Sequence, residues 1–545
     1  MSRVVASDRA AAWRLKEIGK RWLEEHCGIF PESGSKLGFR EYEGRLGENS
    51  PRSRARSLAL TRSTLAEVEQ LPEAAFRGDD WLDRRGFLSR LRTDLLFSGD
   101  LARWRTNPQR HCDAAVDAIF DLVVRHASKP GAILPAVEAR LEAIPGYLAA
   151  GASCIRNPVP LWTELAERSC DGAVEFLDGL VPELSKVSPH SEKTASLLRS
   201  AAGAFKDYAR AIGRKKSGPR NGYAVGRERF EFLIRERLGL DLTLPEARAS
   251  GERLVALHEH LLGEAAKRFG RRKAAEIIEC AASAWRTDGP LLDHYRAVTA
   301  RIKSRLAGLD LVTLPERESL EVLPVPAFLR HQFPTAAYSA PPPFSRDQTG
   351  IFWVNDLSLV QSDPERKARE IRQHFGLELT SVHEGYPGHH LQFVVQYQHP
   401  SRLRRLFEHS IFYEGWTMWC EKLAVEKGLA DFPEAGLVQL HDALWRAHRI
   451  VIDCGLQEGT LSPAAAARRL EQGVGFTRAR AAGDVSWYTS SPTIPMSYLL
   501  GRIELEKLHR RLCGEEGWTL RRFNDWVLSH GAIPWSWIWR ARLEV

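Results

Sequence analysis

The chain has 545 residues, of which 43% are hydrophobic and 27% are charged, and this composition is ordinary for a soluble globular protein of one large or two ordinary domains. The formal net charge of +8 is spread along the sequence, which favours a solvated surface and gives only weak support for acidic partners. No run of about 18 apolar residues occurs and the eight cysteines form no C-x-x-C pair, so we expect a cytoplasmic protein with reduced thiols and no membrane span.

The first part of the chain, residues 1–221, predicts a series of helices. It opens with an amphipathic stretch and shows no signal peptide, and apolar residues then recur at helical spacing, as from Leu58 to Leu71 and from Ala195 to Ile212. This region contains no cluster of metal-ligand residues, so we assign it a structural and cleft-forming role. Joints between its helices are expected at four prolines, Pro130, Pro145, Pro158 and Pro182.

The basic, glycine-rich stretch 213–222 marks the end of this region. A phosphate or nucleic-acid contact is one interpretation, but no aromatic or strand context accompanies it, which favours a solvated linker. We therefore expect no nucleic-acid partner. Residues 222–545 then form the predicted catalytic region, either as a second helical domain or as part of one continuous domain. Its first helices are expected at about 225–239, 245–269, 272–287 and 291–307.

Three histidines and one glutamate fall within eight residues in the sequence His383-Glu384-Gly385-Tyr386-Pro387-Gly388-His389-His390. Imidazoles are common zinc ligands, and an adjacent carboxylate can act as a general base. The usual zinc-peptidase pattern H-E-x-x-H places its histidines four residues apart, whereas position i+4 here is a proline. In a regular helix six residues rise about 9 Å, too far for one metal. A break at Pro387-Gly388 could draw His389 back towards His383, with His390 as the alternative ligand.

A third candidate ligand follows in the aromatic segment 412–421. Glu414 lies there between aromatic residues, where a buried carboxylate would be costly unless a cation accompanied it. Two histidines and one carboxylate are a common ligand set for catalytic zinc and leave one position open for water. Glu421 lies seven residues further on the same helical face and could accept the spare ring N–H of a zinc-bound histidine.

With H-E-G-Y-P-G-H-H followed by E-G-W, the chain resembles the bacterial domain-of-unknown-function 885 family, whose members look like relatives of the glutamate-zincin metallopeptidases. The specific motifs of this resemblance run from about Gly350 to about Leu508, with fainter similarity back to about Gly222. The resemblance implies zinc as the cofactor and Glu384 as the general base. The ligands that it implies are His383, His389 and Glu414.

Two further segments carry substrate-binding candidates. The stretch 350–355 follows proline-rich sequence and predicts a strand. By resemblance it would be an edge strand beside the metal helix, with Phe352 and Val354 contacting an extended peptide; a small structural hairpin is the alternative. Arg449 and Asp453 match the family pattern R-x-x-x-D-x-G-L-H and are expected to pair at i, i+4 near the ligands, while Arg449 could instead bind a substrate carboxylate.

The last motif lies between Tyr488 and Tyr498, which match the family pattern R-Y-x-x-x-P-G-Q-A-x-x-Y. Either hydroxyl could donate a hydrogen bond to the developing oxyanion, and either could instead be a core or rim tyrosine. The family glycine and glutamine are replaced by Thr493 and Ile494, and the family histidine near position 457 is Gln457. The first replacement argues for altered substrate recognition or a changed reaction.

These observations predict a mainly α-helical, zincin-like fold with a deep cleft and a small β element beside the metal helix. The expected function is zinc-dependent hydrolysis of a peptide or small amide, in which Glu384 takes a proton from water activated by one Zn²⁺ and passes it to the leaving amine. Manganese, cobalt or iron would also suit the ligand types. The alternatives are a metal enzyme with another reaction and a non-catalytic binding protein. The presence of Glu384 argues against the binding protein, which would not need a general base.

Overall fold

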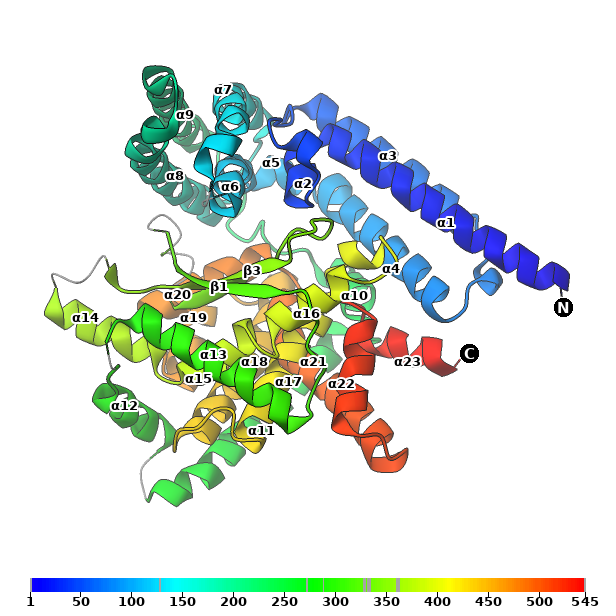
Figure 1. Ribbon diagram of the computed structural model, residues 1–545, viewed down its shortest axis with the longest axis vertical. Coiled ribbons are helices and arrows are strands. Elements are labelled where there is room, and N and C mark those ends of the chain that lie inside the picture. Colours follow the sequence, from blue (N-terminus) through cyan, green and yellow to red (C-terminus); the bar gives the residue numbers. More distant parts are fainter. Residues whose placement is uncertain are drawn as a thin grey trace.

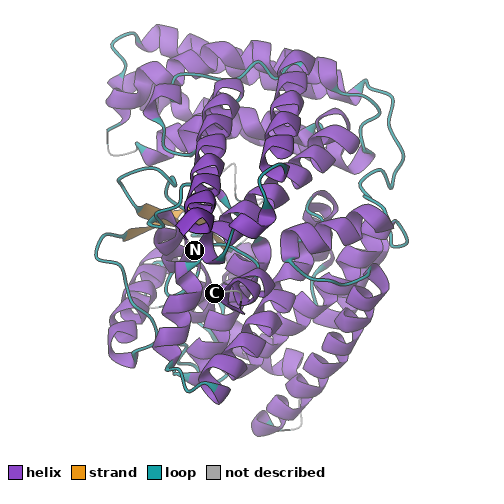
Figure 2. Cartoon of the chain, turned by 90° about the vertical axis from the view of Figure 1, so that its right-hand side faces the viewer, coloured by secondary structure: helices purple, strands orange, loops and turns teal. Residues whose placement is uncertain are grey.

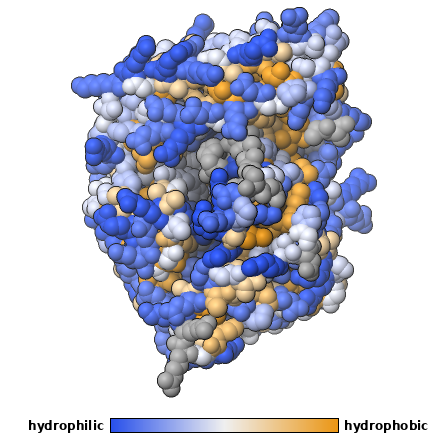
Figure 3. All heavy atoms as spheres, turned by 90° about the vertical axis from the view of Figure 1, so that its left-hand side faces the viewer, coloured by the Kyte–Doolittle hydropathy of each residue, from blue (hydrophilic) through white to orange (hydrophobic). Residues whose placement is uncertain are grey.

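The protein is mainly α-helical, as the sequence predicted, and its described strands form one small sheet (Figure 2). The computed structural model describes residues 2–126, 129–270, 273–287, 289–326, 330, 335–358 and 363–543. Within this part of the chain, no helix combines the length and the apolar character needed to cross a membrane. One face, seen in Figure 3, is largely hydrophilic with apolar side chains scattered over it.

The N-terminal helices form the upper part of the molecule in Figure 1. They are α1 (Ser2–Ile29), α2 (Pro31–Lys36), α3 (Pro51–Glu69), α4 (Gly78–Leu95), α5 (Arg103–Thr106), α6 (Gln109–Arg125), α7 (Pro130–Cys154), α8 (Pro160–Val187) and α9 (Ser191–Gly213). Pro130 begins α7, as expected, because proline is tolerated at a first helical turn. Pro145 and Pro182 were wrongly expected at joints, since they lie inside α7 and α8.

The remaining elements form the lower part of Figure 1. They are α10 (Arg227–Leu233), α11 (Leu244–Ala266), α12 (Ala274–Ala284), α13 (Leu291–Leu309), β1 (Ser319–Pro324), β2 (Ala336–Ser339), β3 (Thr349–Val354), α14 (Pro364–Ile371), α15 (Leu377–Glu384), α16 (His389–Tyr397), α17 (Ser410–Glu426), α18 (Ala435–Glu458), α19 (Pro463–Val474), α20 (Arg478–Ser490), α21 (Ile494–His509), α22 (Leu520–Ser529) and α23 (Trp535–Leu543). Near residue 272, where a helix was predicted to begin, positions 271 and 272 lie outside the described residues.

The largest hydrophobic core includes residues from both sides of the predicted boundary at residue 221. It runs from Ala11 of α1 to Ala541 of α23 and contains apolar residues of both histidine-bearing helices. A second core lies among α6, α7, α8 and α9 and also contains Trp353 of β3. The division of the chain at residue 221 stays a prediction.

The strands are ordered β1-β3-β2, with β1 parallel and β2 antiparallel to β3. Because side chains alternate along a strand, Phe352 and Val354 face the largest core, while Trp353 faces the second core and lies near Phe120 of α6. The sheet therefore lies between the N-terminal helices and the helices that carry the histidines.

This arrangement corrects the expectation that β3 is an edge strand. β3 is the central strand, so both sides of its main chain are paired and cannot bind an extended peptide. The Phe352 and Val354 side chains are 0% exposed, which also excludes them as substrate contacts. Among the described strands, β2 is an edge that lies beside the histidine motif.

A buried cation fixes the loop between α16 and α17. Arg404 is 0% exposed and donates to Asp83 of α4 at 2.9 Å and to the carbonyl of His530 at 2.5 Å. Gln396 of α16 donates through Nε2 to the carbonyls of Arg404 and Phe407, at 3.0 and 2.7 Å. This network ties both helices to the N-terminal part of the chain.

Replacing Arg404 should therefore destabilise the whole molecule. Arg404→Met leaves the buried Asp83 carboxylate without its cation, which should lower the free energy of unfolding by about 3–5 kcal/mol in urea denaturation. Arg21→Met removes an exposed ion pair with Glu67 and should change the free energy of unfolding by about 1 kcal/mol or less. Equal losses in the two variants would contradict this account of the loop.

Candidate metal centre

The histidine motif is a broken helix. α15 ends at Glu384, α16 begins at His389, and the turn between them contains a cis peptide bond before Pro387. Gly388 packs directly on the end of α15, where an added Cβ would overlap the carbonyl oxygens of Val382 and His383. Only glycine permits this approach.

The break brings His389 beside His383. The ring centroids of the two histidines are 4.8 Å apart with planes at 85°. Trp416 of α17 holds the turn in place by donating from Nε1 to the Pro387 carbonyl at 2.8 Å. The predicted effect of Pro387-Gly388 on the histidine spacing is thus present in the structure.

Glu414 of α17 completes a cluster with these two histidines. Its Oε2 lies 3.6 Å from His383 Nε2 and 3.4 Å from His389 Nε2, and one ligand atom from each residue lies within 4.8 Å of the others. All three residues are buried. Both distances exceed ordinary hydrogen-bond lengths, and Glu414 Oε2 has no hydrogen-bond partner. Two ligand atoms roughly 2.0–2.1 Å from a tetrahedral zinc ion are about 3.4 Å apart, so the distances from Glu414 to each histidine suit such an ion.

The electrostatics favour opposite charges within the cluster. Burial opposes ionisation of Glu414, but the neighbouring His389 and His383 outweigh it and hold the pKa of this carboxyl well below its usual range. Burial likewise opposes the charged form of His383, while Glu414 and Glu421 raise its pKa to about 10. A bound cation would replace the proton that makes the His383 ring positive, because histidine ligates a metal in its neutral form.

Glu421 supports His383 from the other side of the ring. Its Oε1 lies 2.6 Å from His383 Nδ1, and the glutamate is 2% exposed. This bond orients the imidazole so that Nε2 faces Glu414 and His389. It is the geometry that the sequence predicted for a residue behind a zinc-bound histidine.

Glu384 directly follows His383 at the end of α15. Its side chain is partly exposed, and its carboxylate forms no hydrogen bond or ion pair with any residue that the structure describes. Its charge acts on the neighbouring His383, and on Tyr295 and Tyr338, whose pKa values are raised by burial first and by Glu384 among other charges. A free carboxylate beside the cluster can accept a proton from water.

His390 belongs to a different network. Its Nε2 lies 2.6 Å from Glu318, which also binds Lys303 and the Tyr386 hydroxyl, and its Nδ1 lies 3.1 Å from the Tyr338 hydroxyl. Both ring nitrogens therefore have partners. Of the two candidate histidines, the structure brings His389 to His383 and Glu414.

Three residues near the site were not among the candidates from the sequence. Tyr338 of β2 stacks on His389 with centroids 6.3 Å apart at 17°, and Tyr413 lies 5.9 Å from the same ring. Glu318 holds His390 and Tyr386, and its pKa is about 2 because those contacts and Lys303 outweigh burial. Glu318 and Tyr338 lie far from the motifs in sequence, so spacing could not identify them.

The two candidate tyrosines occupy different positions. Tyr498 of α21 faces Glu414, and burial and that carboxylate raise its pKa well above its ordinary value. α21 comes this close because Gly501 packs on Gly415, where either glycine's Cβ would overlap the facing backbone. Tyr488 of α20 is fully buried and reaches the site only through other residues.

Tyr488 belongs to a network centred on Arg449. Its hydroxyl accepts from Arg449 Nε at 2.7 Å and donates to Asp484 at 2.8 Å. Arg449 lies over the Trp445 ring at 3.9 Å and the Tyr498 ring at 4.7 Å. This buried arginine therefore supports Tyr498, and its Nη1 has no hydrogen-bond partner.

The expected ion pair between Arg449 and Asp453 is wrong. Arg449 pairs with Asp484 at 3.9 Å, while Asp453 Oδ2 accepts the backbone N–H of Thr493 at 3.0 Å before α21. Thr493 stands where the family pattern has glycine, and its φ of 71° is in the left-handed region that favours glycine. Gln457 donates to the Tyr488 carbonyl at 3.2 Å, so it also supports this region.

The close approach at Gly388 generates a test of the cluster. Gly388→Ala should push His389 away from His383 and weaken zinc binding at least tenfold, measured by chelator competition on purified protein. Gly203→Ala, whose added Cβ meets nothing within 4 Å, is the matched control and should bind zinc like the wild type. Unchanged affinity in Gly388→Ala would show that this contact does not hold the histidines together.

Comparison with known proteins supports the fold and the family. A Shewanella oneidensis protein described as a "putative lipoprotein of unknown function" has a TM-score of 0.76 at 20% identity, over 97% of this chain and 100% of its own. A "putative lipoprotein" from Colwellia psychrerythraea has a TM-score of 0.74 at 16% identity, over 97% and 98%. No curated protein matches the chain. The family described as "Bacterial protein of unknown function (DUF885)" matches residues 31–541, and the chain therefore belongs to the DUF885 family.

Proposed function

We propose that this protein is a zinc-dependent hydrolase, and specifically a metallopeptidase that cleaves peptide or small amide bonds. One observation carries the proposal: a buried carboxylate oxygen of Glu414 without a hydrogen bond faces two imidazole nitrogens at distances that suit shared ligation. Without a metal the charged histidines stabilise this carboxylate, and a cation bound to the neutral imidazoles would take over that role.

His383, His389 and Glu414 would hold the ion, with Glu421 orienting His383. A zinc ion bound by two histidines and one carboxylate keeps an open position, lowers the pKa of water towards about 7 and polarises a carbonyl. Glu384 follows the first ligand in sequence, is partly exposed and has no competing partner among the described residues. It would accept a proton from the attacking water and pass it to the leaving amine.

Two further elements would position the substrate. Tyr498 faces Glu414 and would donate its hydroxyl hydrogen to the oxygen on which negative charge develops. β2 carries Tyr338 against His389, and its outer edge could pair with the main chain of an extended peptide. This assigns to β2 the role that the sequence suggested for β3.

The first test is metal content. We expect about one zinc per chain in the wild type and loss of the metal in His383→Ala and Glu414→Ala. Elemental mass spectrometry of the purified proteins measures this content. Glu384→Gln should keep the metal but lose cleavage of a peptide library by about 10²–10⁴-fold, because it lacks only the base. A wild type that takes up no metal when zinc is supplied overturns the proposal, and cleavage that survives in Glu384→Gln overturns the role of the base.

The two tyrosines make a second test. Tyr498→Phe should retain zinc and lower kcat by about 10²–10³-fold, since it removes an oxyanion donor. Tyr488→Phe breaks bonds to Arg449 and Asp484 in a buried network, so it should mainly lower the free energy of unfolding, by about 1–3 kcal/mol. A larger loss of kcat in Tyr488→Phe than in Tyr498→Phe would reverse these assignments.

A further inference from the structure

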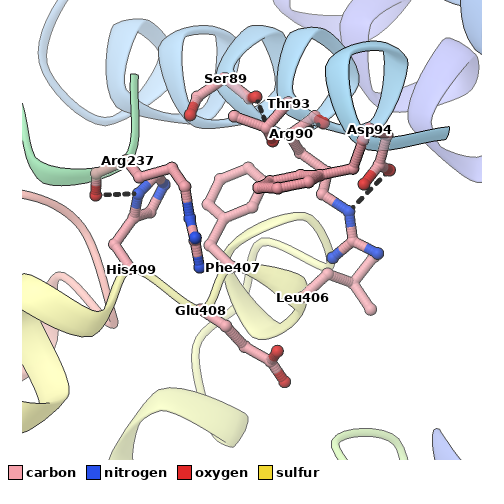
Figure 4. A pocket seen from close by; sticks show the side chains of 10 residues that line it. Ser89, Arg90, Thr93, Asp94, Arg237, Leu406, Phe407, Glu408 and His409 are labelled. Carbon is pink, nitrogen blue, oxygen red and sulfur yellow. Dashed lines mark hydrogen bonds and ion pairs between the residues drawn. The ribbon is translucent and has the colours of Figure 1, made fainter. Parts of the chain in front are cut away.

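A pocket of about 160 Å³ lies between α4 and the loop that leads into α17. Arg237, from the π-helical turn Ile234–Leu238, extends its guanidinium into this space between His409 and Phe407 (Figure 4). Phe97 and Phe407 give the pocket an apolar wall. It is therefore a small, partly apolar chamber with a cation at one side.

The positive charge of Arg237 has no acidic partner. Its Nη1 donates to the Pro492 carbonyl at 2.8 Å, and it forms no ion pair with any residue in the described part of the chain. The other arginine in the pocket, Arg90, is neutralised by Asp94 at 2.9 Å. Glu408 also lines the pocket, but its exposed carboxylate points away from Arg237 (Figure 4).

Arg237 is also held in place more firmly than a surface arginine. Its carbonyl lies 3.0 Å from Nδ1 of His409, and its guanidinium is fixed by Pro492 just before α21. Burial lowers its pKa, partly offset by Tyr413 and Asp453. A partly desolvated guanidinium with unused donors is a strong receptor for a carboxylate, which it can bind through two parallel hydrogen bonds.

The pocket adjoins the cluster through α17. His409 lines the pocket and directly precedes this helix, so Glu414 lies about 7.5 Å further along its axis. Tyr413 lies close enough to Arg237 for each side chain to affect the pKa of the other, and its ring packs 5.9 Å from the His389 ring. An extended chain advances about 3.3–3.6 Å per residue, so about two residues of a peptide span the same length as this axial rise.

We propose that Arg237 binds the free C-terminal carboxylate of a peptide substrate, so that the enzyme cleaves close to the C-terminus. Phe97 and Phe407 would contact the side chain of the terminal residue. This proposal rests on the peptidase function proposed above. It names the substrate class, a peptide with an unblocked carboxyl end, and assigns Arg237 as the residue that selects it.

The experiment measures binding without turnover. Zinc-loaded, full-length Glu384→Gln protein is immobilised and equilibrated with a library of N-acetylated tripeptides, each prepared both as a free acid and as a C-terminal amide. Mass spectrometry quantifies what is retained. We expect free acids to be retained at least tenfold more than the matching amides, because only the acid offers two acceptors to the guanidinium.

Variants at the same turn assign this preference. Adding Arg237→Gln to the Glu384→Gln protein should abolish the preference for free acids. Arg237→Lys should retain part of this preference, since the positive charge remains but the two parallel hydrogen bonds are lost. Arg235→Gln, an exposed arginine of the same turn, should leave it unchanged. Equal retention of acids and amides with Arg237 intact, retention of neither, or a preference that survives Arg237→Gln would each overturn the proposal.

The acid–amide comparison needs no substitution at Arg237, so it holds even if those variants fold poorly. It is also independent of catalysis. The peptidase proposal fails if the wild type binds no zinc or if cleavage survives in Glu384→Gln. The carboxylate-site proposal fails on the peptide-retention result alone.

Discussion

The contact between Gly388 and the last carbonyls of α15 is the constraint on which the candidate site depends. Six residues separate His383 from His389, and a continuous helix would carry their side chains apart along its axis. Helix α15 instead ends at Glu384, and the chain turns before α16 begins at His389. Gly388, directly before α16, packs against the end of α15. The close approach is possible only without a Cβ, and it brings two histidines that are six residues apart in sequence to a ring-centroid distance of 4.8 Å.

A second glycine contact positions Glu414, the third residue of the cluster, and Tyr498 beside it. Gly415 follows Glu414 directly and packs on Gly501 of α21, so the two helices lie with their backbones in contact. Tyr498 is then carried to the Glu414 carboxylate. In both places backbone-to-backbone packing, rather than a long side chain, sets the distance between functional groups.

The polar groups around the cluster form a layered support. Glu421 orients His383, and the Arg449 network lies behind Tyr498. On the opposite side Glu318 joins His390 to the Tyr386 hydroxyl, and so joins α16 to the turn. Such networks reduce the motion of the groups that they hold, which a reaction needs when charge must develop at a fixed point. Arg237 stands apart, since it is held by backbone carbonyl contacts and keeps its charge uncompensated.

Features that depend on neighbouring residues in the chain could be predicted without the structure. The helical class followed from periodicity, and the break at Pro387-Gly388 followed from the conformational limits of those two residues. The pairing of Glu421 with His383 was also predictable, because the motif chemistry of a metal-bound histidine calls for such a partner. These inferences need only local geometry and the chemistry of the residue types.

Features that depend on contacts between distant segments could be known only from the folded chain. The strand order makes β3 central and buries Phe352 and Val354. The sequence of one strand does not show which other strands will pair with it. Arg449 found Asp484 rather than Asp453 for the same reason. The choice of His389 over His390, and the unpaired charge of Arg237, follow from which groups the fold places opposite them, because pairing energies depend on distance and burial.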